Sequence, residues 1–108
     1  MNGKIIAVLA TLDTKGTEAE YLRQQIEKLG DTALVIDTGV VGTPTTEADI
    51  TRQQVAQAGG TSLEKLLENP TREVAAPIMA DGATHLVTDL VTQDKVSGII
   101  AMGGTQGT

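Results

Sequence analysis

Glycines and hydroxyl side chains gather at the end of the chain, where the apolar run IIAM is followed by GGTQGT. Glycine lets a backbone approach a phosphate closely, and threonine hydroxyls suit phosphate oxygens or Mg²⁺. The pattern is neither a Walker A loop nor a Rossmann G-x-G-x-x-G fingerprint. We predict a phosphate-binding loop; the alternative is a tight strand-to-helix turn without a ligand. Its residues are Gly103, Gly104, Thr105, Gln106, Gly107 and Thr108.

A second polar cluster, TLDTKG, follows the first apolar run. Lys15 is a point charge suited to a phosphate, and Asp13 suits a water or Mg²⁺, or else the N–H groups of its own loop. For Lys15 the alternative is a solvated surface position. Thr11 and Gly16 complete the candidate site, and Asp13 and Lys15 are also the weak candidates for acid–base catalysis.

Asp37 ends the second apolar run and is followed by Gly39. A carboxylate about 20 residues after a glycine loop binds a ribose hydroxyl in dinucleotide folds. Here the first loop has a single glycine, so the match is partial. The alternative is that Asp37 hydrogen-bonds the turn TGVVG, and the sequence leaves both open.

Other reactive side chains have no arrangement that indicates chemistry. His85, the single histidine, is expected on a helix surface. Ser62 and Ser97 have no base and acid nearby in the sequence. The chain has no cysteine, which excludes disulfides and thiolate metal sites. We expect no dedicated metal site.

The first third of the chain predicts a strand, a helix and a strand. KIIAVLA (4–10) fits a buried strand, and 11–16 is expected to be a loop. Thr17 and Glu20 match a capping box that begins a helix, with Ala19, Leu22, Ile26 and Leu29 on one face and Gly30 at its end. Residues 32–37 form the second strand.

The rest of the chain predicts three helices and a third strand. The glycine-, threonine- and proline-rich segment 38–50 is a loop. Capping boxes at Thr51/Gln54 and Thr61/Glu64 begin two short helices, the first ending at Gly59–Gly60. A long helix covers 72–94 and either kinks at Pro77 or begins after it. Its buried face is expected at Val74, Ile78, Gly82, Leu86 and Leu90, with close packing at Gly82. SGIIAMG (97–103) is the third strand.

This order predicts an α/β fold with an open, mostly parallel sheet and a Rossmann-like βαβ start. Ligands in such sheets bind beyond the carboxyl ends of the strands. The three polar segments follow the three strands and should therefore meet at one edge. Residues 1–108 are interpreted as the N-terminal half of a nucleotide-binding domain, truncated after its third strand.

Composition limits the partners. The net charge is −6 and Tyr21 is the one aromatic residue, so we expect no nucleic-acid binding. The first apolar run is too short to span a membrane. The expected location is the cytoplasm. An open sheet leaves apolar edges, so a homodimer is an expected partner state.

The segments VLATLDTKGTEAEYLRQQIEKLG, VIDTGVVG, EADITRQQVAQAGG and IIAMGGTQGT resemble the opening of the ATP-binding domain of the tomato mosaic virus resistance protein. The resemblance covers essentially the whole chain, and uncharacterised bacterial and fungal proteins share that domain. It implies a longer chain with a second α/β half, and ATP or a related nucleotide contacted by the glycine loop. It implies no reaction.

Three functions remain at this point. The first is an ATP-binding module of a larger protein, with Mg²⁺ as a companion of the phosphates. The second is an enzyme that acts on a phosphorylated or carboxylated metabolite. The third is a structural or assembly fragment without a ligand.

Overall fold

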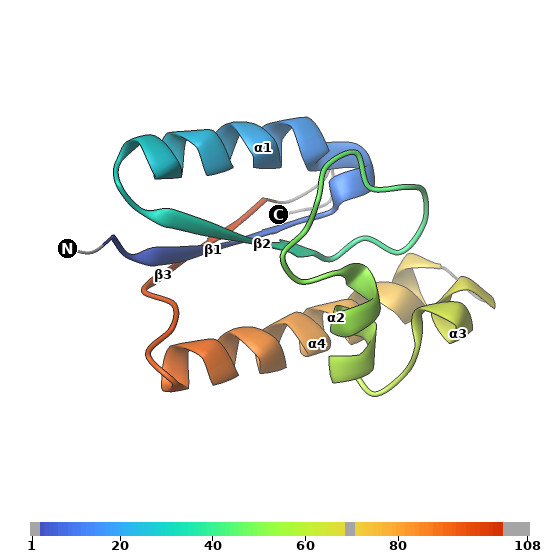
Figure 1. Ribbon diagram of the computed structural model, residues 1–108. Helices are drawn as coiled ribbons and strands as arrows, with labels where there is room; N and C mark the ends of the chain where they lie inside the picture. The colour runs from blue at the N-terminus through green and yellow to red at the C-terminus, as the bar shows by residue number, and fades with distance from the viewer. Residues whose placement is uncertain (1–2, 69–70, 103–108) are drawn as a thin grey trace.

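Three parallel strands form the centre of the protein, and helices cover both faces (Figure 1). The computed structural model describes residues 3–68 and 71–102. Its elements are β1 (Ile5–Ala10), α1 (Leu12–Lys28), β2 (Thr32–Asp37), α2 (Arg52–Ala58), α3 (Leu63–Glu68), α4 (Arg72–Thr92) and β3 (Gly98–Ala101). The expected α/β class, open parallel sheet and βαβ start are confirmed.

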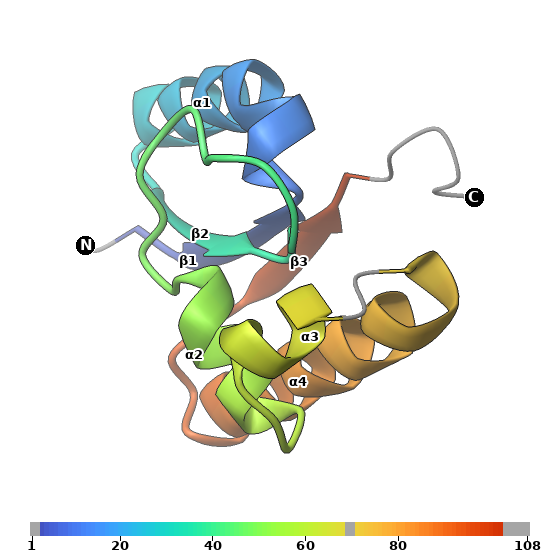
Figure 2. The same ribbon diagram turned by 90° about the vertical axis from the view of Figure 1, so that its right-hand side faces the viewer.

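The strand order is β2-β1-β3, so the chain reverses its direction across the sheet after β2. Helix α1 connects β1 to β2 on one face, and α2, α3 and α4 connect β2 to β3 on the opposite face (Figure 2). Helices on opposite faces are what right-handed crossovers require when the direction of travel reverses. The point of reversal lies between β1 and β3.

Aliphatic side chains fill a layer on each face of the sheet. Residues alternate along a strand between the two faces, so Ala7 contributes to the layer under α4 and Val8 to the layer under α1. Ile36 and Val35 divide in the same way on β2. All four are fully or almost fully buried.

Helices α2 and α4 approach each other closely at two glycines. A Cβ at Gly82 would overlap the Val55 carbonyl oxygen of α2 and lie 2.9 Å from the Gly59 nitrogen. A Cβ at Gly59 would in turn lie 2.5 Å from the Ile78 carbonyl oxygen. The close packing expected at Gly82 is therefore confirmed.

The beginning of α1 differs from expectation. Residues 12–16 are helical rather than a loop, with Thr11 as the N-cap and a local departure from helical geometry at Lys15 (φ −119°, ψ 20°). The kink at Lys15 separates this first turn from the longer part of α1. The helix expected after residue 16 is therefore present, but α1 begins at Leu12, earlier than the Thr17/Glu20 pattern predicts. Leu29 was also placed wrongly, since it is 80% exposed at the helix end. Gly30 ends the helix as expected, with φ 90°.

The other helix signals were partly right. The Thr51/Gln54 capping box is formed, whereas α3 begins one residue later than expected and Ser62 Oγ accepts the Lys65 N–H. Helix α4 runs through Pro77 from Arg72, so the later start is wrong. Its most buried row is shifted by one residue from the expected face: Ala75, Met79, Ala83 and Val87.

Helix α4 is the longest helix, and neither it nor any other helix of the described residues has the length and apolar character to span a membrane.

Candidate functional site

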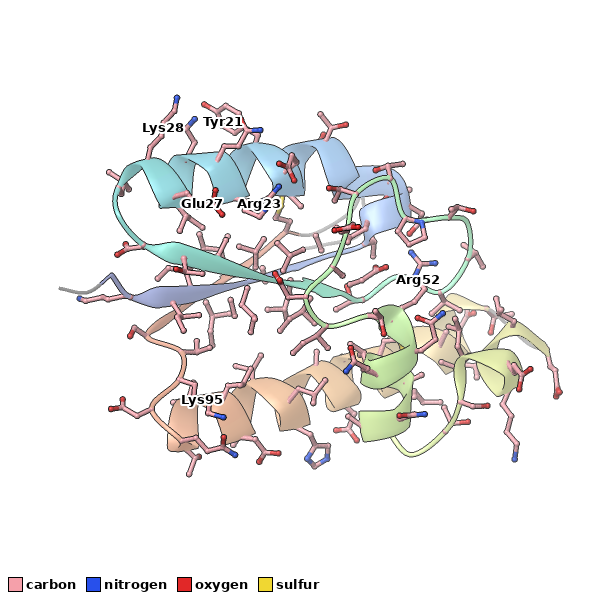
Figure 3. All side chains as sticks on the ribbon, viewed as in Figure 1. Tyr21, Arg23, Glu27, Lys28, Arg52 and Lys95 are labelled. Carbon is pink, nitrogen blue, oxygen red and sulfur yellow. The ribbon has the colours of Figure 1, made fainter. Side chains whose placement is uncertain are left out.

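Arg52 lies at the carboxyl edge of the sheet and is 3% exposed (Figure 3). The Thr51 capping box fixes the start of α2 and places Arg52 at its first helical position. From there the side chain reaches two carboxylates that follow different strands. Its Nε donates to Asp37 at 2.8 Å, and one terminal nitrogen donates to Asp13 at 3.1 Å.

The guanidinium of Arg52 has no unused donor. A guanidinium carries five N–H groups. Besides the bonds above, the nitrogen that binds Asp13 also donates to Asp37 at 3.4 Å. The other terminal nitrogen donates to the carbonyl oxygens of Val41 at 2.9 Å and Gly42 at 3.2 Å. Arg52 therefore clamps the loop 38–50 onto the sheet and is not available to a ligand in this arrangement.

Asp37 is 1% exposed and accepts hydrogen bonds from three parts of the chain. Besides Arg52, the backbone N–H of Leu12 donates to it at 3.2 Å and that of Gly39 at 2.9 Å. The bond to Gly39 is the turn that the sequence offered as one alternative. Both carboxylate oxygens of Asp37 therefore already have protein partners. Ribose binding by Asp37 stays a prediction.

The candidate glycines of this edge are packed against side chains. A Cβ at Gly39 would lie 2.5 Å from both Arg52 and Asp13, and a Cβ at Gly16 would overlap Thr45. Thr45 also donates from its hydroxyl to the Leu12 carbonyl oxygen at 3.0 Å. These two glycines thus make room for the ion-pair cluster and for the loop 38–50.

Thr11 and Lys15 lie at the start of α1. The Thr11 hydroxyl is 2.8 Å from that of Thr14, and the Thr11 side chain makes no capping bond to the helix. Lys15 is partly buried and forms no ion pair within the described part of the chain. Unlike Asp13 and Asp37, neither side chain takes part in the Arg52 cluster.

A second charged group ties the loop to the outer side of α1. Glu20 pairs with Arg23 and accepts the Thr46 hydroxyl at 3.1 Å. The hydrogen bond from Arg23 lowers the pKa of the Glu20 carboxyl, and the bond from Thr46 acts in the same direction. The same pairing raises the pKa of Arg23.

A groove of about 640 Å³ opens on the other side of β1, between β3 and α4. Leu9, Met79, Ala83 and Val87 form its apolar floor, and hydroxyl groups line its rim. Among the described residues, none that line the groove is charged. The hydroxyl residues are Thr11 and Thr38, which follow β1 and β2, and Thr84 and Thr88 of α4.

Thr11, Thr38 and Met102, which directly follow β1, β2 and β3, all line this groove. Met102 leads directly into Gly103–Thr108, and the whole of that predicted loop lies outside the described residues. No group of three histidine or acidic side chains able to hold a metal is present in residues 3–68 and 71–102.

Arg52 is the residue that the sequence interpretation missed. Two signals pointed to it: the Thr51/Gln54 capping box next to it, and the presence of two acidic residues, Asp13 and Asp37, beyond adjacent strands. Because the Arg52–Asp37 pair is separated by a loop with no regular structure, its geometry does not follow from spacing.

Comparison with known proteins places the chain in a family. Residues 4–108 match the model described as the N-terminal domain of an uncharacterised protein family, UPF0261. The chain belongs to this family. A UPF0261 protein of Clostridium tetani is 43% identical over 108 residues, which are 100% of this chain and 26% of that protein.

Other UPF0261 relatives are less similar. A protein of Brucella suis is 36% identical over 99% of this chain and 26% of its own length. One of Rhizobium meliloti is 32% identical over 97% of this chain and 25% of its own. The chain thus spans about a quarter of the length of these relatives. No solved structure matches it.

Proposed function

We propose that this UPF0261 domain is a nucleotide-binding module of a larger protein, with ATP as the nucleotide and Mg²⁺ on its phosphates. The observation that carries the proposal is the groove between β1, β3 and α4. It opens where the strand order reverses, which is where open α/β sheets bind their ligands. The whole groove has a volume of about 640 Å³, and its carboxyl end, at Thr11 and Thr38, is the part that we assign to the ligand.

The chemistry of the groove suits a nucleoside at its carboxyl end. Apolar side chains such as Leu9 and Met79 offer a surface for a base, and Thr11 and Thr38 offer hydroxyls for a sugar. The part of the lining that the structure describes carries no charge, which makes it a poor phosphate site. We therefore assign the phosphates to Gly103–Thr108 and Lys15, the residues that the sequence pattern predicts for them.

Electrostatics favours this side of β1 over the Arg52 cluster. Asp13 and Asp37 outnumber the single guanidinium between them, and no N–H of Arg52 remains for an anion. A phosphate there would meet net negative charge. The resemblance to the ATP-binding domain of the tomato mosaic virus resistance protein is what favours ATP over other nucleotides.

The test is calorimetric titration of ATP, with and without Mg²⁺, into this chain and into a form extended to the length of the relatives. Gly104→Leu should abolish binding without changing the unfolding midpoint. Thr38→Val should weaken binding about threefold to tenfold, the worth of one neutral hydrogen bond, whereas Thr92→Val, exposed at the end of α4, should not. Unchanged affinity in Gly104→Leu, or no binding by either form, contradicts the proposal.

A further inference from the structure

The two outer strands of the sheet, β2 and β3, differ in how far their free edges are hydrogen-bonded. The edge of β2 is partly covered by the loop that follows it. Asp37 N–H donates to the Ile50 carbonyl oxygen at 3.0 Å, and Ile50 N–H donates to the Val35 carbonyl oxygen at 3.0 Å. The Asp49 carboxylate accepts the Val35 N–H at 2.7 Å. Residues 49–50 thus bond the N–H and C=O of Val35 and the N–H of Asp37, so the carboxyl half of the β2 edge is already covered.

Within residues 3–68 and 71–102, β3 pairs with β1 alone. Its sequence is Gly-Ile-Ile-Ala, with no proline or charged residue to discourage pairing. Ile99 is 51% exposed and Ala101 is exposed too. Natural proteins protect an edge of this kind, and the described part of the chain does not.

The groove beside β3 has a lining suited to the packing of another helix. Along α4, a row of small exposed side chains repeats every four residues and therefore forms one straight ridge. The same cavity is lined by Ile99 and Ala101 of β3. Small side chains on one wall and apolar side chains on the other let a second helix approach α4 closely. The row consists of Ala76, Ala80, Thr84 and Thr88.

The topology decides on which face the next connection runs. The connection from β2 to β3 passes across β1 towards the β3 edge of the sheet, and its helix α4 packs on the face opposite α1. A right-handed connection that continues from β3 in the same direction must place its helix on that same face. Helix α4 lies on that face (Figure 2), and its residues form one wall of the β3–α4 groove.

We propose that the sheet continues past β3 with a further parallel strand, and that the connecting helix packs in the groove along Thr84, Thr88 and Ile99. Both come from the segment that follows the aligned region in the longer UPF0261 proteins; the 108 aligned residues make up 26% of the Clostridium tetani relative. The carboxyl end of the groove, at Thr11 and Thr38, stays open for a ligand.

A second copy of the chain fits the groove less well. Two copies joined at β3 by a two-fold axis would pair their strands antiparallel. Neither copy could place α1 or α4 in the other copy's groove, because both helices are packed on their own sheet. The packed residues are Ala19, Ile26, Met79 and Ala83. The exposed row on α4 would remain uncovered.

The first test is hydrogen exchange of the amides in 98–101, measured by mass spectrometry without nucleotide. This chain, diluted until it is monomeric, is compared with a form extended to the length of the relatives. Exchange at β3 should be at least about tenfold slower in the extended form, and its amides should stay protected on dilution. Equal exchange in the two forms, or protection in the extended form that is lost on dilution, overturns the proposal.

The second test is a matched pair of substitutions. Thr88→Arg, in the groove, should lower the unfolding temperature of the extended form by at least about 4 °C, because a buried arginine must be accommodated. It should change that of this chain by less than about 1 °C, since Thr88 is exposed here. Thr17→Arg, exposed on α1, should have little effect in both forms. Equal effects of Thr88→Arg in the two forms overturn the proposal. Neither test depends on whether ATP binds.

Discussion

Arg52 joins three segments that are distant in the sequence: the start of α1, the end of β2 and the loop after it. Its partners are Asp13, Asp37 and the carbonyl oxygens of Val41 and Gly42. A buried ion pair repays its desolvation only when its remaining hydrogen-bonding groups are satisfied, as they are here. At the scale of the residue, this cluster fixes the shape of the carboxyl edge next to the proposed site.

Replacement of Arg52 by methionine should destabilise the protein strongly. Methionine keeps most of the side-chain volume but leaves two carboxylates without their cation, at an expected cost of about 3–5 kcal/mol in the free energy of unfolding. Arg23→Met, which breaks the exposed pair with Glu20, should cost less than about 1 kcal/mol. Urea unfolding of both variants measures the difference, and equal losses would show that the Arg52 cluster is not a structural clamp.

Glu20 should give the stability a small dependence on pH. Its pKa is lowered in the folded state by the hydrogen bond from Arg23. The stabilisation is therefore complete above the ordinary glutamate value of 4.5 and is lost as the pH falls through the lowered pKa. The urea midpoint of Glu20→Gln should approach that of the parent as the pH falls from 6 to 3. A constant difference between Glu20→Gln and the parent would refute this.

The sequence indicated which side chains lie at the carboxyl edge but not which of them are already bonded. Asp37 and Gly39 follow a strand, and this is visible in the pattern of apolar residues. The partner of Asp37 comes from α2, across the irregular loop 38–50. A buried ion pair of this kind depends on the path of that loop, for which no local periodicity exists.

At the scale of the elements, the contact between α2 and α4 depends on the absence of two side chains. Gly82 and Gly59 let the helix backbones meet. Sequence reasoning found Gly82 because a helix-interior glycine costs stability unless packing requires it. It placed the buried row one residue away, because Val74, Ile78, Leu86 and Leu90 are more apolar than the alanines that face the sheet. Small residues buried by close approach are not distinguished by hydropathy.

Gly82→Ala should destabilise the protein, against helix propensity. Propensity alone predicts a gain of about 1 kcal/mol, but the new methyl group would overlap the Val55 carbonyl oxygen. We expect a net loss of about 1–3 kcal/mol, typical of overpacking. Asp81→Ala, at the adjacent exposed position, should stay within about 0.5 kcal/mol of the parent. Thermal unfolding decides, and a rise in midpoint for Gly82→Ala would contradict the observed approach of the helices.

At the scale of the whole molecule, the order of elements and the parallel sheet followed from three short aliphatic runs separated by helical patterns. The start of α1 could not be predicted from the sequence, because Thr11–Gly16 has the composition of a loop. Its first turn is held instead by tertiary contacts, namely Asp37 on the Leu12 N–H and Thr45 on the Leu12 carbonyl oxygen. Helical geometry there depends on groups that only the folded chain brings together.

The exposed edge at β3 should make this 108-residue chain associate with itself. Ile99 is 51% exposed on a strand with one described partner, and an apolar edge of this kind is a template for pairing. Sedimentation velocity should show a mass that rises with concentration. Ile99→Lys should keep the chain monomeric, because a charge at the edge opposes pairing. Leu29→Lys, at an 80% exposed position directly after α1, should leave the association unchanged. A monomer at every concentration would mean that β3 is protected by residues outside the described ranges, and association lost equally in both variants would place the contact elsewhere.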